Sequence, residues 1–156
     1  MALLYATYYY PHRAGSLADG LINVYLRVQT WLAGVLIGAF DDSVSVTGTV
    51  LHGRFPLQII KDCSSLDAQA LLVGAILAFP APRSRRLLGA LLGALALNVV
   101  NLFRIASLYF IGVHARPYFD TAHEEILPLV LILTASLLFF GWTSWVRRSE
   151  DARGNV

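Results

Sequence analysis

The chain has a single cysteine, Cys63, and two other residues whose chemistry could complement it, Arg104 and His123. A thiolate is a strong nucleophile, an imidazole exchanges protons near neutral pH, and a guanidinium can stabilise the oxyanion of acyl transfer. Together these three groups could break or remake an acyl bond. Because one cysteine cannot form an internal disulfide, Cys63 is a buried thiol, an intermolecular link or a nucleophile.

The composition points to a membrane rather than to an aqueous environment. Of the 156 residues, 56% are hydrophobic and 14% are charged, and the mean hydropathy is +0.60. Soluble domains carry about 25% charged residues. A net charge of +2 gives no basic patch for nucleic acid. His12, His52 and His114 show no metal-ligand spacing, so we predict neither a metal nor a cofactor.

The apolar residues fall into four blocks, each close to the length of about 20 residues that crosses a bilayer as a helix. The blocks are residues 21–40, 64–80, 87–113 and 123–146. We therefore predict an all-α integral membrane protein, a bundle of about four transmembrane helices forming a single domain over residues 1–156.

Two segments have a different character. Residues 43–60 are rich in Val and Thr with a break at His52-Gly53, a pattern that predicts two short strands around a turn outside the bilayer. The tyrosines at positions 8–10 suit the headgroup region, and we read no cleavable signal peptide in the first ten residues.

The distribution of basic residues predicts the orientation, since short cytoplasmic loops are enriched in Lys and Arg. If four helices alternate, one side of the membrane carries Arg13, Arg83, Arg85, Arg86, Arg147, Arg148 and Arg153. The other side has only Arg54, Lys61 and Arg116 among six carboxylates. We therefore expect a multi-pass protein of the cytoplasmic membrane with both termini in the cytoplasm. The segments 43–62 and 114–121 then face outward.

In this topology three helices direct the reactive groups to one outer cavity. Cys63 begins the second helix, His123 begins the fourth, and Arg104 lies about nine residues or ~13 Å from the outer end of the third. An arginine inside the membrane costs at least ~2.5 kcal/mol and usually faces a cavity or a partner. The structural alternatives for Arg104 are an ion pair with an acid such as Asp67, or a side chain that snorkels to the interface. Alone, His123 could be a surface residue and Cys63 a small apolar filler. Asn101 shares the helix face of Arg104.

The ordered set of motifs resembles the exosortase/archaeosortase family of membrane cysteine enzymes. It is carried by Asp62-Cys63-Ser64-Ser65, by Asn101-Leu102-Phe103-Arg104-Ile105 and by His123, with the strand-like segment before the cysteine. The resemblance covers about residues 43–146, and the chain looks like a short, minimal-core member.

The resemblance implies that Cys63 is the nucleophile, Arg104 its electrostatic partner and His123 the general acid and base. Family members cut C-terminal sorting tails, made of a short motif, a transmembrane helix and a basic cluster, from exported proteins and pass the product to an acceptor. We therefore expect a cysteine protease or transpeptidase whose partners are such proteins and the lipid bilayer, with the oligomeric state left open. The residues expected to bind substrate or support the site are Asn101, Asp67 and Ser64. The substrate helix could dock where Gly89 and Gly93 allow close approach.

Two other functions compete with this one. The chain could be a non-catalytic membrane partner, a degenerate relative in which Arg104 pairs with an acid of another subunit. One difference from the family favours this non-catalytic role. The family usually has glycine two positions after the cysteine, where this chain has Ser65. A small-molecule transporter has weaker support, since four helices without inverted repeats or broken-helix pairs offer little for transport.

Overall fold

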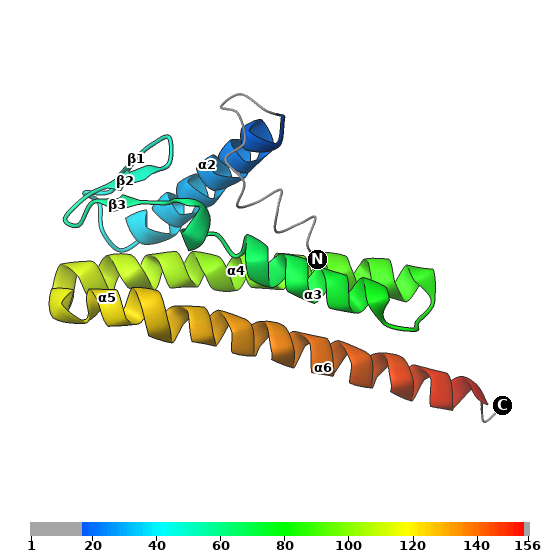
Figure 1. The fold of residues 1–156 in the computed structure, drawn as a ribbon. Helices are drawn as coiled ribbons and strands as arrows, with labels where there is room; N and C mark the ends of the chain where they lie inside the picture. Colours follow the sequence, from blue (N-terminus) through cyan, green and yellow to red (C-terminus); the bar gives the residue numbers. More distant parts are fainter. Residues whose placement is uncertain (1–16, 155–156) are drawn as a thin grey trace.

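The computed structural model describes residues 17–154 and consists mainly of helices (Figure 1). The segment with the tyrosine cluster lies outside the described residues. In chain order the elements are α2 (Leu17–Gly38), β1 (Ser45–Thr47), β2 (Val50–His52), β3 (Leu57–Gln58), the 3-10 turn η1 (Lys61–Cys63), α3 (Leu66–Ala78), α4 (Arg83–His114), the 3-10 turn η2 (Arg116–Tyr118), α5 (Phe119–Thr121), the π-helical turn η3 (Ala122–Ile126) and α6 (Leu127–Gly154).

The structure confirms the all-α membrane class, and every predicted apolar block contains a helix. Among the described residues, three helical segments are long and apolar enough to cross a membrane: Asp19–Gly38, Arg83–His114 and Arg116–Ser149. Helix α3 has 13 residues, or ~20 Å of helix, which is shorter than the ~30 Å hydrocarbon core. The second predicted span, which corresponds to α3, therefore stays a prediction.

Helix α4 is the centre of the bundle (Figure 1). Helix α6 runs antiparallel beside it, α3 packs against its amino-terminal half, and α2 and the sheet lie along its carboxy-terminal half. We call the end of the bundle with Arg83, Arg85, Arg86, Arg147 and Arg148 the arginine end. The opposite end, with the three strands and α5, is the sheet end.

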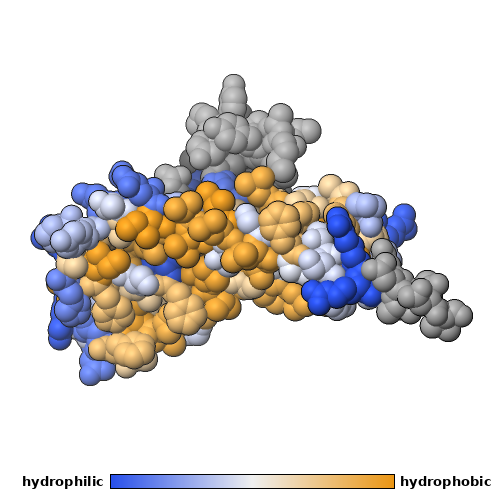
Figure 2. All heavy atoms as spheres, turned by 90° about the horizontal axis from the view of Figure 1, so that it is seen from below, coloured by the Kyte–Doolittle hydropathy of each residue, from blue (hydrophilic) through white to orange (hydrophobic). Residues whose placement is uncertain are grey.

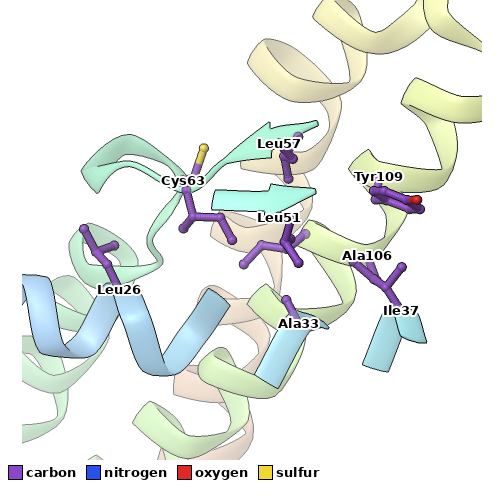
Figure 3. Close-up of a cluster of buried hydrophobic side chains, with 10 residues drawn as sticks. Leu26, Ala33, Ile37, Leu51, Leu57, Cys63, Ala106 and Tyr109 are labelled. Atoms are coloured by element: carbon purple, nitrogen blue, oxygen red, sulfur yellow. The ribbon is translucent and has the colours of Figure 1, made fainter. Parts of the chain in front are cut away.

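Two apolar clusters hold these layers together. One joins α2, the strands and the carboxy-terminal half of α4, and Figure 3 shows it around Leu51 and Tyr109. The other joins α3, α6 and the amino-terminal half of α4 around Leu72, Leu97 and Leu131.

The outside of the bundle is also apolar. Large apolar side chains are exposed along both long helices, among them Leu91, Leu95, Val99, Leu133, Leu137 and Phe140. Seen from the side of α6, the surface has a broad hydrophobic band between two hydrophilic ends (Figure 2). A patch of this size is typical of a surface that meets lipid rather than water.

The short sheet is antiparallel throughout, in the order β1-β2-β3. The hairpin between β1 and β2 turns at Gly48, whose φ of +65° is a conformation that glycine adopts easily. The predicted strand pair is thus present, with a third strand added. The predicted break at Gly53 begins the connection from β2 to β3, where a Cβ atom would come within 2.6 Å of the Tyr109 hydroxyl.

A buried carboxylate fastens the sheet to α4. Asp41 accepts hydrogen bonds from the Ser43 amide (3.1 Å) and hydroxyl (2.6 Å), and from the Tyr109 hydroxyl (2.9 Å). The Tyr109 oxygen in turn accepts from the backbone N–H of Arg54 (3.1 Å), whose guanidinium lies 3.5 Å from Asp41. One carboxylate thus joins the loop after α2, the loop after β2 and α4.

A second polar cluster lies between α2, α3 and α4. The Tyr25 hydroxyl donates to the Asn98 amide oxygen (2.8 Å) and accepts from the amides of Gln29 (3.0 Å) and Gln69 (3.1 Å). Interhelical hydrogen bonds of this kind contribute ~0.6 kcal/mol each in membrane bundles. The cluster therefore sets the relative positions of three helices.

The Asp41 cluster predicts a pH dependence of stability. The hydrogen bonds from Ser43, then that from Tyr109 and the charge of Arg54, hold the pKa of Asp41 below its ordinary value, against the opposing effect of burial. A carboxyl whose pKa is lowered by folding stabilises the fold above its unfolded pKa of about 3.9, and this contribution is lost as pH falls through the folded pKa.

We expect Asp41→Asn to lower the melting temperature in detergent at pH 7 by about 2 to 4 °C and to flatten the loss of stability below about pH 4. The matched control is Asp42→Asn, since Asp42 is the adjacent carboxylate and is exposed. Equal melting temperatures for the two variants at every pH would show that the Asp41 cluster does not anchor the sheet.

Candidate active site

Cys63 ends the short turn η1, between the sheet and α3. Its N–H donates to the Ile60 carbonyl (3.0 Å), while the amide and hydroxyl of Ser64 both donate to the Lys61 carbonyl (2.9 and 2.5 Å). Ser64 therefore closes the turn that carries the thiol. In Figure 3 the sulfur of Cys63 points away from Leu26 and Leu51, at the edge of the apolar cluster.

Ser65 occupies the position at which the resembled family usually has glycine. It is the N-cap of α3, with φ −82° and ψ 15°, a conformation with negative φ that serine adopts without strain. Its side chain is fully buried and accepts a hydrogen bond from the Gln69 amide (2.5 Å). Serine is thus compatible with the backbone beside Cys63.

His123 reaches the thiol from a widened helical turn. In η3 the N–H of Leu127 donates to the carbonyl of Ala122, five residues earlier, and Pro128 follows with no N–H to donate. Such π-helical turns are frequent at functional sites. The Nε2 atom of His123 lies 3.4 Å from the Sγ atom of Cys63, across 60 residues of sequence.

Two aromatic residues orient the His123 ring. Phe119 stacks on it with ring centroids 5.8 Å apart and an interplanar angle of 4°. Phe55, from the loop after β2, lies 5.0 Å from Phe119 and packs directly against Gly112 of α4, where a side chain would clash with it. The sequence analysis missed both residues, although the four-residue spacing of Phe119 and His123 is a signal for contact on a helix.

Arg104 is the third residue of the candidate site, with Cys63 and His123. It lies in the middle of the carboxy-terminal half of α4. It is 7% exposed, and its Nη1 atom donates to the carbonyl oxygen of Cys63 (3.4 Å). Its Nε atom has no hydrogen-bond partner among the described residues.

The expected structural alternative, an ion pair of Arg104 with an acid, is absent from the part of the chain that the structure describes. The two ion pairs there are Arg54–Asp41 and Lys61–Asp19. Asp67 is exposed on the first turn of α3. A buried guanidinium without a carboxylate is costly, so its charge is available to an anion that forms beside it.

Asn101 is the second polar residue of this α4 face. Its side chain is fully buried, and within residues 17–154 neither its amide nitrogen nor its amide oxygen has a hydrogen-bond partner. Buried amides are normally satisfied, so an unsatisfied one requires an explanation. A bound substrate that reaches this depth could supply the missing partner.

The arrangement has the parts that thiol catalysis needs: a nucleophile in hydrogen-bond reach of a base, and a cation near the reacting atoms. Of the residues predicted for the site, Cys63, Arg104 and His123 come together. Asn101 lies one helical turn from Arg104, and Ser64 supports the turn. Over residues 17–154 no three His, Cys, Asp or Glu side chains are grouped to hold a metal ion.

Comparison with known proteins agrees with the resemblance seen in the motifs. The family model described as transmembrane exosortase (Exosortase_EpsH) matches residues 1–141. No curated protein and no solved structure matches the chain. Since the family match covers most of the sequence, including every residue of the candidate site, the chain belongs to the transmembrane exosortase family.

Proposed function

We propose that this sorting-related membrane protein is a cysteine transpeptidase or protease that cuts C-terminal sorting tails from exported proteins. The observation that carries the proposal is the 3.4 Å contact between the Cys63 thiol and the His123 imidazole, beside the buried cation of Arg104. In the proposed orientation the arginine end faces the cytoplasm, both termini are cytoplasmic and the site faces outward in the cytoplasmic membrane.

The depth of the site supports cleavage at the membrane–water boundary. Counted from the arginine end, a hydrocarbon core of ~30 Å takes about 20 residues of α4, from Leu87 to about Ala106. Arg104 then lies at the far boundary of the core. Tyr109 and Gly112, which contact the sheet loops, lie beyond it. A peptide bond just outside a substrate's transmembrane helix would enter at this level.

In the first half-reaction His123 accepts the proton of the Cys63 thiol, and the sulfur attacks the scissile carbonyl carbon. The tetrahedral intermediate collapses as the carbon–nitrogen bond breaks, and His123 gives its proton to the leaving amine. The amine departs with the substrate's transmembrane helix. The amino-terminal part of the substrate remains on Cys63 as a thioester.

In the second half-reaction an amine or hydroxyl of the acceptor, or water, gives its proton to His123 and attacks the thioester carbonyl. The carbon–sulfur bond breaks, and the thiolate takes back the proton from His123. The enzyme returns to its initial state with no other co-reactant.

Arg104 stabilises the negative charge that forms during both steps, first on sulfur and then on the carbonyl oxygen. The low dielectric around it makes this interaction stronger than it would be in water. Asn101, whose buried amide nitrogen is unsatisfied, supplies a second donor to the substrate.

Replacing the nucleophile tests the proposal. We expect Cys63→Ser to reduce tail cleavage at least ~10³-fold, because a serine hydroxyl beside the same imidazole is a much weaker nucleophile. The assay uses protein in lipid vesicles with an exported protein from the same cells that ends in a transmembrane helix and basic residues. Ser136→Ala, at an exposed site on α6, is the control and should cleave at the normal rate. Full activity of Cys63→Ser would exclude the mechanism.

Replacing the cation separates a catalytic from a structural role of Arg104. We expect Arg104→Met to reduce the cleavage rate by about 10²- to 10³-fold without lowering the melting temperature, because removing an unpaired buried charge relieves its desolvation cost. Arg27→Gln is the matched control, since Arg27 lies in the apolar part of α2 but is exposed.

A normal rate in Arg104→Met would assign the arginine a purely structural role. Loss of folded protein in this variant, with Arg27→Gln intact, would mean that the guanidinium holds the bundle together.

A further inference from the structure

A groove opens between α4 and α6 in the half of the bundle toward the arginine end. Its volume is about 580 Å³. It is lined almost entirely by apolar atoms, from side chains that include Leu88, Leu92, Ala96, Leu137, Gly141 and Trp145. Ala96, its member nearest to Arg104 on α4, is eight residues from that arginine, or ~12 Å along the helix. The groove is therefore separate from the Cys63 site.

The glycines of α4 form part of the groove, but they do not leave room for another backbone. The indole of Trp142 sits directly against Gly89, and a Leu72 methyl lies 2.9 Å from the position that a Cβ atom at Gly93 would take. The space beside these two glycines is thus occupied by side chains of the same chain, Trp142 and Leu72. What stays open is an apolar groove beside these filled positions, which a hydrocarbon chain can occupy without close contact between two backbones.

One arginine, Arg85, lies beside the groove where it reaches the arginine end. The guanidinium of Arg85 lies 5.7 Å from the ring of Trp145, which lines the groove, and it donates to the carbonyl of Val146 (3.3 Å). The guanidinium of Arg147 lies 5.9 Å from the ring of Phe79.

Phe79 follows α3 and packs edge-on against the ring of Trp142 at 5.5 Å, outside the groove lining, so Arg147 lies on the α3 side of α6 and does not reach the groove. Neither Arg85 nor Arg147 takes part in an ion pair among the described residues. Glu150 and Asp151 follow in the sequence, and the five arginines of this end leave an excess of positive charge.

We propose that this groove binds a phospholipid with an anionic headgroup, with one acyl chain between α4 and α6 and the phosphate at Arg85. Basic pockets between transmembrane helices bind anionic lipid headgroups, and arginine matches phosphate through several N–H donors. A second transmembrane helix fits less well, because its cytoplasmic flank would itself be basic and would be repelled.

Tryptophan fluorescence tests the proposal with the intact protein. Trp142 and Trp145 line the groove, and the third tryptophan, Trp31, is removed as Trp31→Phe to leave only groove reporters. The probes are phosphatidylglycerol and phosphatidylcholine with the same brominated acyl chains, titrated into detergent-solubilised protein. We expect phosphatidylglycerol to quench at about one-tenth or less of the phosphatidylcholine concentration, and the difference to shrink at high salt.

Three variants distinguish a specific site from general attraction to the surface. Arg85→Gln should weaken the phosphatidylglycerol preference about fivefold, whereas Arg147→Gln, at the same end but against Phe79 and outside the groove, should leave it nearly unchanged. Gly141→Leu should reduce quenching by both lipids, because a Cβ atom at Gly141 meets nothing within 4 Å and the leucine can fill the groove.

Equal quenching by the two lipids would overturn the proposal. So would an effect of Arg147→Gln as large as that of Arg85→Gln, since it would show non-specific charge attraction. A lysine-flanked polyleucine helix that displaces the brominated phosphatidylglycerol, with no effect of Arg85→Gln, would make the groove a helix-docking site instead.

Discussion

A guanidinium buried in an apolar bundle must find hydrogen-bond acceptors, and Arg104 finds one in a loop rather than in another helix. The acceptor is the carbonyl of Cys63, in the short turn between the sheet and α3. This turn is closed by Ser64, and α3 begins immediately after it at the buried cap Ser65. The thiol is therefore located by the same backbone that satisfies the cation.

The second constraint acts from the opposite side and fixes the imidazole. A π-helical turn carries His123, Phe119 stacks on its ring, and Phe55 braces Phe119 from the sheet. The sheet is itself fastened to α4 through Asp41 and Tyr109. The small sheet thus supports both partners of the site. It positions the loop before Cys63, and its Phe55 packs against Phe119, which stacks on His123. A site that must hold a nucleophile and a base within hydrogen-bond distance requires such support on both partners.

Much of this could be predicted from sequence because hydrophobicity acts locally. The four apolar blocks gave helices, and the depths of Cys63, Arg104 and His123 along those blocks indicated that they meet. Interactions that depend on tertiary packing could not be predicted in this way. The stacking of Phe119, the widened turn before Pro128 and the limited length of α3 each depend on neighbours far away in the sequence. The packing of the Trp142 indole against Gly89 also depends on tertiary structure and could not be predicted from the sequence.

If Cys63 is the nucleophile, it forms a covalent bond with the amino-terminal part of the substrate. The most direct test is to mix the protein in lipid vesicles with an exported substrate, quench with acid after a short time and determine the mass of the intact protein. We expect an adduct with the mass of the cut substrate, located on the peptide that contains Cys63 and released by hydroxylamine as a thioester would be. Cleavage that proceeds with no adduct on Cys63 at any time point, or an adduct on another residue, would contradict this expectation.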